Sequence, residues 1–165
     1  MRPAEPGLRT IVIGLGSPLM GDDGLGIVAL ERLRSLAPES VELIDGGTWG
    51  MNLLHLVEGA DRLLLLDAID AGKAAGEPIE LVNAEVPRYF AAKLSPHEID
   101  LRDVLALAEL RGSLPAEIVA LGVQPGEIAM GTELTPPVSA AIDALVERAA
   151  DRLARWETPL TASRP

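Results

Sequence analysis

Short, continuous runs of apolar residues alternate along this chain with segments in which apolar residues recur at helical spacing. The continuous runs predict buried strands over residues 10–14, 41–44, 63–66 and 118–123, with a further strand over 79–82. Buried strands that alternate with helices are typical of a mainly parallel sheet covered on both faces. We therefore predict an α/β fold, a single-domain three-layer α/β/α structure with a twisted, mainly parallel sheet of about five strands.

The helical segments are predicted from their apolar faces and from their start signals. The first helix has as its inner face Gly26, Ala29, Leu30, Leu33 and Leu36. A short helix is predicted over residues 49–58, and a later one follows Ser95-Pro96-His97-Glu98, which resembles a capping box. That later helix has as its inner face Leu101, Val104, Leu105 and Ala108. The last helix begins near Thr135, so we predict one domain over residues 1–156 and a loose tail over 157–165.

Composition and charge exclude several classes of function. The 165 residues carry a net charge of −11, which opposes binding to nucleic acid or to an anionic membrane. Cysteine is absent, which excludes disulfides, thiolate nucleophiles and cysteine-bound zinc. No apolar run approaches the ~20 residues of a membrane span. Residues 1–9 contain no apolar core long enough for a signal peptide, so none is expected there. We expect a cytoplasmic protein that does not interact with membranes.

A glycine-rich segment, residues 14–26, connects the first strand to the first helix and carries the adjacent acids Asp22 and Asp23. Its spacing does not match the dinucleotide-binding fingerprint. Acids at its far end also argue against a phosphate cradle, since phosphates bind to N–H donors and cations. The acids suit metal binding or proton transfer, although a structural turn with a capping Asp also fits. Of the two, Asp22 is the better candidate for a structural role.

Further polar residues are expected at the carboxyl ends of the strands, where ligands bind in such sheets. Asp67 ends the third strand and needs a partner, because an isolated buried charge is unfavourable. His97 is predicted in the first turn of a helix, where the helix dipole favours the neutral imidazole that binds metals. With Asp23 these residues form a candidate two-carboxylate, one-imidazole metal site. The alternatives are an Asp67 bonded to loop N–H groups and a polar loop histidine.

The loop after the second strand, Asp45-Gly46-Gly47-Thr48, has two interpretations. It is either a strand-to-helix turn or a substrate-recognition loop at the same edge of the sheet as the acids. Paired glycines would let a peptide approach the backbone there. Four other residues are expected to have ordinary roles, namely Asp70 as a solvated turn residue, His55 as a helix residue and the Tyr89-Phe90 pair in core packing.

Five motifs, in order and spacing, resemble those of hydrogenase maturation endopeptidases, the proteases that trim the large-subunit precursor of nickel–iron hydrogenases. The motifs are Ile13-Gly14-Leu15-Gly16-Ser17 with Gly21-Asp22-Asp23-Gly24-Leu25-Gly26, Asp45-Gly46-Gly47-Thr48, Leu66-Asp67-Ala68, Lys93-Leu94-Ser95-Pro96-His97 and Gly122-Val123-Gln124-Pro125. The resemblance extends from about residue 10 to residue 156 and is nearest the branch that serves uptake hydrogenases. One departure is Ser17, where many relatives carry Asn.

The resemblance implies that Asp23, Asp67 and His97 contact nickel and carry catalysis. It implies that a short C-terminal extension is removed from the large-subunit precursor only after nickel has been inserted, so that the nickel belongs chiefly to the substrate. Other divalent ions can occupy such a site in vitro. The ion could polarise the scissile carbonyl or activate water. Alternatively, Asp23 or Asp67 could be the general base while nickel positions the substrate.

Two other functions fit part of the pattern. A non-catalytic maturation chaperone would recognise nickel-loaded precursor without cutting it, but it would not need all three candidate ligands together. A nucleotide-binding α/β enzyme would share the fold, but the acids in the glycine-rich segment disfavour it. We expect a peptidase.

Overall fold

The computed structural model describes residues 7–47, 50–93 and 101–157, and at its centre is a five-stranded sheet. The strands are β1 (Thr10–Gly14), β2 (Glu42–Asp45), β3 (Arg62–Ala68), β4 (Pro78–Val82) and β5 (Glu117–Val123). Their order is β2-β1-β3-β5-β4; all neighbours are parallel except β4, which runs antiparallel to β5. The predicted α/β class, strand number and mainly parallel arrangement are confirmed.

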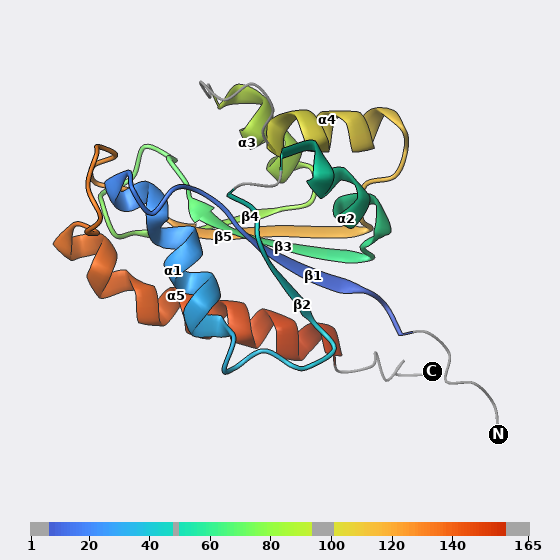
Figure 1. Ribbon diagram of the computed structural model, residues 1–165, viewed down its shortest axis with the longest axis horizontal. Helices are drawn as coiled ribbons and strands as arrows, with labels where there is room; N and C mark the ends of the chain where they lie inside the picture. Colours follow the sequence, from blue (N-terminus) through green and yellow to red (C-terminus); the bar gives the residue numbers. More distant parts are fainter. Residues whose placement is uncertain (1–6, 48–49, 94–100, 158–165) are drawn as a thin grey trace, which may run out of the picture.

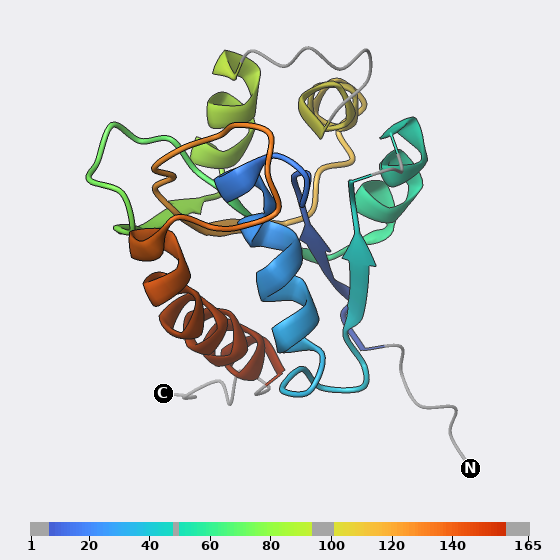
Figure 2. The same ribbon diagram turned by 60° about the vertical axis from the view of Figure 1, so that its left-hand side comes forward.

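Helices cover both faces of this sheet (Figure 1; Figure 2). On one face lie α1 (Leu25–Leu33) and α5 (Pro136–Glu157), and on the other lie α2 (Leu53–Gly59), α3 (Glu85–Ala92) and α4 (Leu101–Leu110). Two 3-10 turns, η1 (Gly21–Gly24) and η2 (Gly50–Asn52), precede α1 and α2. The result is the three-layer arrangement predicted from the sequence.

Alternation along the central strands creates two separate cores. In β3, Leu63 and Leu65 join the core under α2, α3 and α4, whereas Leu64 and Leu66 join the core under α1 and α5. All four side chains are fully buried. Burying a leucine stabilises the fold by roughly 1.5–3 kcal/mol, so the uninterrupted leucine run of β3 fixes this strand at the centre of the sheet.

Most helix predictions are confirmed, and the exceptions have local causes. The predicted inner face of α4 is buried at all four positions. Leu36 is 57% exposed, because α1 ends at Leu33 and the chain then turns, with the amides of Leu36 and Ala37 both bonded to the Leu33 carbonyl. The sequence did not indicate α3, which begins after Asn83 adopts a positive φ of 51°. Helix α5 continues through Glu157, the first residue assigned to the tail.

Strand register sets the geometry of the sheet's carboxyl edge. Gly14, the last residue of β1, lies opposite both Asp45 of β2 and Leu66 of β3. Asp67 follows directly and lies opposite Gly122 of β5. Because parallel strands end at the same edge, the loops that follow β1, β2 and β3 are brought together there, as the sequence predicted.

Candidate active site

The glycine-rich segment turns tightly around Asp23. Gly16 has a φ of +103°, and a Cβ atom at this position would lie 1.9 Å from the Asp23 carbonyl oxygen. Only glycine combines this backbone conformation with such a close approach. The amide of Ser17 donates to Asp23 Oδ2 at 2.9 Å, which fixes the carboxylate of a side chain that remains partly exposed. The segment therefore holds one acid at the edge of the sheet, within reach of solvent.

Asp67 is the buried acid of the site, with a relative exposure of 1%. Its Oδ1 accepts a hydrogen bond from the Ala68 amide at 2.9 Å, and its Oδ2 accepts one from Lys93 Nζ at 3.2 Å. Burial raises the pKa of Asp67 to about 6, although the ammonium group of Lys93 opposes this shift. The partner expected for the buried carboxylate of Asp67 is thus chiefly Lys93. The sequence pattern did not indicate this pairing.

Asp23, Asp67 and Lys93 form one electrostatic unit. The negative charge of Asp23 adds to the upward shift in the pKa of Asp67. Burial works against the ammonium form of Lys93, but the charges of Asp67, Tyr89 and Asp23 together with the Asp67 hydrogen bond outweigh it and raise the pKa of Lys93. The two predicted acids therefore interact with each other, and the ammonium group of Lys93 offsets part of their combined negative charge.

The third predicted ligand, His97, lies outside the described residues, so a site formed by Asp23, Asp67 and His97 stays a prediction. Within the described ranges, no group of three or more histidine, aspartate or glutamate side chains is placed to hold a metal ion. Two carboxylates alone supply too few protein ligands for a tight site. The residue types fit an ion that arrives with ligands of its own, since carboxylate and imidazole bind several divalent metals.

Asp22, the neighbour of Asp23, has a structural role. Its side chain is fully buried and accepts hydrogen bonds from the amides of Gly126, Glu127 and Thr135 and from the Thr135 hydroxyl, at 2.7–3.0 Å. Burial favours the neutral acid, but the combined hydrogen bonds outweigh burial and lower the pKa of Asp22. The loop that precedes α5 is therefore anchored beside the glycine-rich segment.

Gln124, which sequence reasoning did not assign, organises the loop after β3. Its Oε1 accepts hydrogen bonds from the amides of Ala71 at 2.7 Å and Lys73 at 3.1 Å, and its Nε2 donates to Asp70 Oδ1 at 3.0 Å. Asp70 is exposed, as expected of a turn residue, but the bond from Gln124 lowers its pKa. The Gly122-Val123-Gln124-Pro125 motif was the only signal in the sequence that could have indicated this role.

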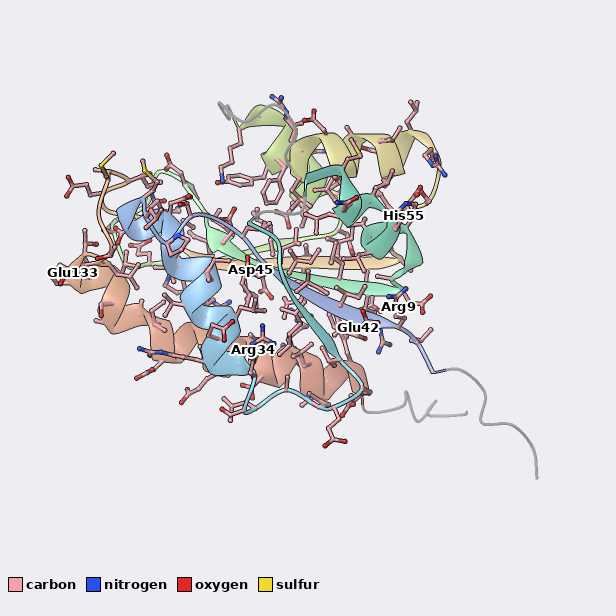
Figure 3. The ribbon with its side chains drawn as sticks, in the orientation of Figure 1. Arg9, Arg34, Glu42, Asp45, His55 and Glu133 are labelled. Atoms are coloured by element: carbon pink, nitrogen blue, oxygen red, sulfur yellow. The ribbon has the colours of Figure 1, made fainter. Side chains whose placement is uncertain are left out.

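The loop after β2 forms a local turn. Asp45 Oδ1 accepts a hydrogen bond from the Gly47 amide at 2.9 Å, and the Gly46 amide donates to the Gly14 carbonyl at 2.8 Å. Asp45 is exposed at the end of β2, whereas His55 projects from α2 and is also exposed (Figure 3). Thr48 lies outside the described residues. The predicted turn after β2 is therefore present in the structure. A recognition role for residues 45–48 stays a prediction.

Comparison with known proteins shows which enzyme family the chain resembles. The family model described as hydrogenase maturation protease matches residues 27–152. The chain belongs to this family. It is 38% identical over 152 residues to the hydrogenase expression/formation protein HupD of Bradyrhizobium diazoefficiens, covering 90% of this chain and 79% of that one. It is 38% identical over 144 residues to the hydrogenase 2 maturation protease of Escherichia coli, covering 86% and 88%.

Solved structures agree with this assignment. The hydrogenase maturating endopeptidase HybD of E. coli superimposes on this hydrogenase maturation protease with a TM-score of 0.83 at 35% identity, covering 90% of this chain and 93% of that one. A maturation protease from Thermococcus kodakarensis gives a TM-score of 0.70 at 27% identity, covering 89% and 93%. The expected enzyme class, a hydrolase that acts in hydrogenase maturation, is confirmed.

No helix in the described ranges has the length and apolar character of a membrane span.

Proposed function

We propose that this maturation protease removes the C-terminal extension of a nickel-loaded nickel–iron hydrogenase large-subunit precursor. The observation that carries the proposal is the placement of two acids at the carboxyl edge of the sheet, with Asp23 held by the Ser17 amide and Asp67 one residue before the end of β3. One acid is partly exposed and the other is buried, so a docked precursor can reach Asp23 while Asp67 stays fixed. His97 is expected to complete the set. The loop at residues 45–48 is proposed to contact the precursor.

Nickel reaches the protease as part of the substrate in this mechanism. Two carboxylates and one imidazole leave coordination positions open, and an ion already held by the precursor would be presented at high effective concentration once the proteins dock. A protein-bound divalent ion can polarise a carbonyl or activate water. Asp67 also suits the general-base alternative, because a carboxylate with a pKa of about 6 is a stronger base at neutral pH than an ordinary aspartate.

The proposal is tested by mixing the purified protease with precursor prepared with and without nickel. We expect a gel shift of the large subunit only for the nickel-loaded preparation. Adding nickel to the protease alone should not substitute for loading the precursor. Equal cleavage of both preparations would contradict substrate-borne nickel as the signal and favour an ordinary metal-dependent or acid–base peptidase.

Two further outcomes address the alternative functions. Binding of the loaded precursor without cleavage, under conditions in which a related protease cuts its own precursor, would favour the chaperone. Saturable binding in a nucleotide titration would favour the nucleotide-binding enzyme. The reaction is proposed to take place in the cytoplasm, as expected from the sequence.

A further inference from the structure

Lys93 places its ammonium group directly beside the buried carboxylate of Asp67. It follows directly on α3 and caps that helix, its amide bonded to the carbonyls of Tyr89 and Phe90. Its Nζ lies 3.2 Å from Asp67 Oδ2 and 5.8 Å from the centre of the Phe90 ring. The ammonium group therefore takes up the one carboxylate oxygen of Asp67 that the Ala68 amide leaves available.

The two members of this ion pair differ in their freedom to move. The Asp67 side chain is 2% exposed and lies within the central strand, whereas the Lys93 side chain is 37% exposed. A lysine carries a compact charge on a flexible four-carbon stem, so its ammonium group can withdraw into solvent while the carboxylate stays in place. The pair can thus open at Lys93 without any change in the sheet.

Charge explains why a cation is needed there. Asp23 and Asp67 act on each other as like charges, and a buried carboxylate without a partner is unfavourable. We propose that Lys93 is a specificity-determining residue that stands in for the metal, neutralising Asp67 and Asp23 until precursor-borne nickel displaces its ammonium group. This inference rests on the proposed metal contacts of Asp23 and Asp67. A free ion must compete with an internal cation, and therefore binds weakly.

The test is a calorimetric titration of the purified protease with nickel chloride, with no precursor present. Lys93→Met retains the apolar stem and removes the charge, and we expect it to bind nickel at least about tenfold more tightly than the wild type, because a unit charge a few ångströms away contributes on this scale. Lys73→Met is the matched control, since Lys73 is the other lysine of the chain and is exposed. Its nickel affinity should equal that of the wild type.

Two more variants separate charge from structure. Lys93→Arg keeps a cation beside Asp67 and should keep the weak nickel affinity, whereas Lys93→Gln keeps a hydrogen-bond donor without charge and should bind tightly. If Lys93→Met does not fold, the nickel affinity of Lys93→Gln tests the role of the Lys93 charge. Nickel should also raise the melting temperature of both uncharged variants by more than that of the wild type, which a merely structural lysine would not produce.

The outcomes distinguish this inference from the proposed function. Equal nickel affinities in the wild type and in the folded uncharged variants would overturn the role of Lys93, even where loaded precursor is cut. Tighter binding in those variants would support that role, even where the wild type fails to cut loaded precursor and the proposed function is contradicted. A gain of the same size in Lys73→Met would overturn the role too, because it would report only the change in net charge.

Discussion

Asp22 and Thr135 lie 113 residues apart in the sequence and are joined by two hydrogen bonds. Asp22 Oδ1 accepts from the Thr135 amide at 2.7 Å, and Oδ2 accepts from the Thr135 hydroxyl at 2.7 Å. The amides of Gly126 and Glu127 donate to the same carboxylate. One buried acid therefore connects the segment that carries Asp23 to the loop that leads into α5.

Replacing Asp22 by Asn is expected to destabilise the protein by about 2–4 kcal/mol. The amide nitrogen of asparagine would face backbone donors, so at least one buried hydrogen bond would be lost along with the charge that strengthens the others. Urea denaturation measures this free energy of unfolding, and hydrogen exchange should report faster opening of residues 126–135. Thr135→Val removes only the hydroxyl donor and should cost about 1 kcal/mol. Equal effects of the two variants would contradict the anchoring role of the carboxylate.

The Asp22 carboxylate should also make the fold sensitive to acid. Its pKa is lowered in the folded state, so its contribution to stability is present above its ordinary pKa of 3.8 and is lost as the pH falls through the lower folded value. Wild-type stability should therefore fall more steeply than that of Asp22→Asn below about pH 4. Urea denaturation at a series of pH values tests this, and parallel curves for the two proteins would contradict it.

Gly16→Ala is expected to disturb the site through Asp23. A Cβ at residue 16 would meet the Asp23 carbonyl oxygen at 1.9 Å, and the φ of +103° is unfavourable for alanine. Gly72→Ala is a matched control, because Gly72 also has a positive φ, +70°, but has open space around its missing Cβ. We expect about 1 kcal/mol of destabilisation for Gly72→Ala and at least about 2 kcal/mol more for Gly16→Ala, measured by thermal unfolding. Similar losses in both would show that the close contact with Asp23 has no energetic effect.

Asp67 should contribute a pH dependence of the opposite sign. Its pKa rises from 3.8 to about 6 on folding, so the protonated form is favoured in the folded state, and this contribution to stability is lost as the pH rises from about 4 to about 6. The stability of the wild type relative to Asp67→Asn should fall over this range by up to about 3 kcal/mol. Asp151→Asn, at an exposed position on α5, serves as the control for replacing an aspartate by asparagine. A flat difference between the wild type and Asp67→Asn would contradict the burial effect.

Asp23→Ala should separate catalysis from folding. The Asp23 side chain is partly exposed and lies outside both apolar cores, so its removal should change the unfolding free energy by about 1 kcal/mol or less. Processing of nickel-loaded precursor should be lost or sharply reduced, as should processing by His97→Ala. Circular dichroism and the precursor gel shift measure the two properties. Parallel loss of folding and processing would indicate a structural role instead.

The hydrophobic pattern of the sequence was sufficient to predict the fold class and the edge of the sheet that carries the site. Continuous apolar runs require burial on both faces, and parallel strands bring their carboxyl ends together, so the pattern alone places Asp23 and Asp67 at one edge. The inner face of α4 was equally predictable, because apolar residues recur along one face of a helix at the helix period. Helix α3 could not be predicted in this way, because its short segment has only two buried residues.

The partners of the acids were decided by the tertiary structure alone. Lys93 lies 26 residues beyond Asp67, and Gly126, Glu127 and Thr135 lie more than a hundred residues beyond Asp22. A pattern of apolar and polar positions indicates which side chains are buried. It does not indicate which charged group or backbone amide will bond to a given carboxylate. That choice depends on the path of each loop across the edge of the sheet, and therefore on how the complete set of layers packs.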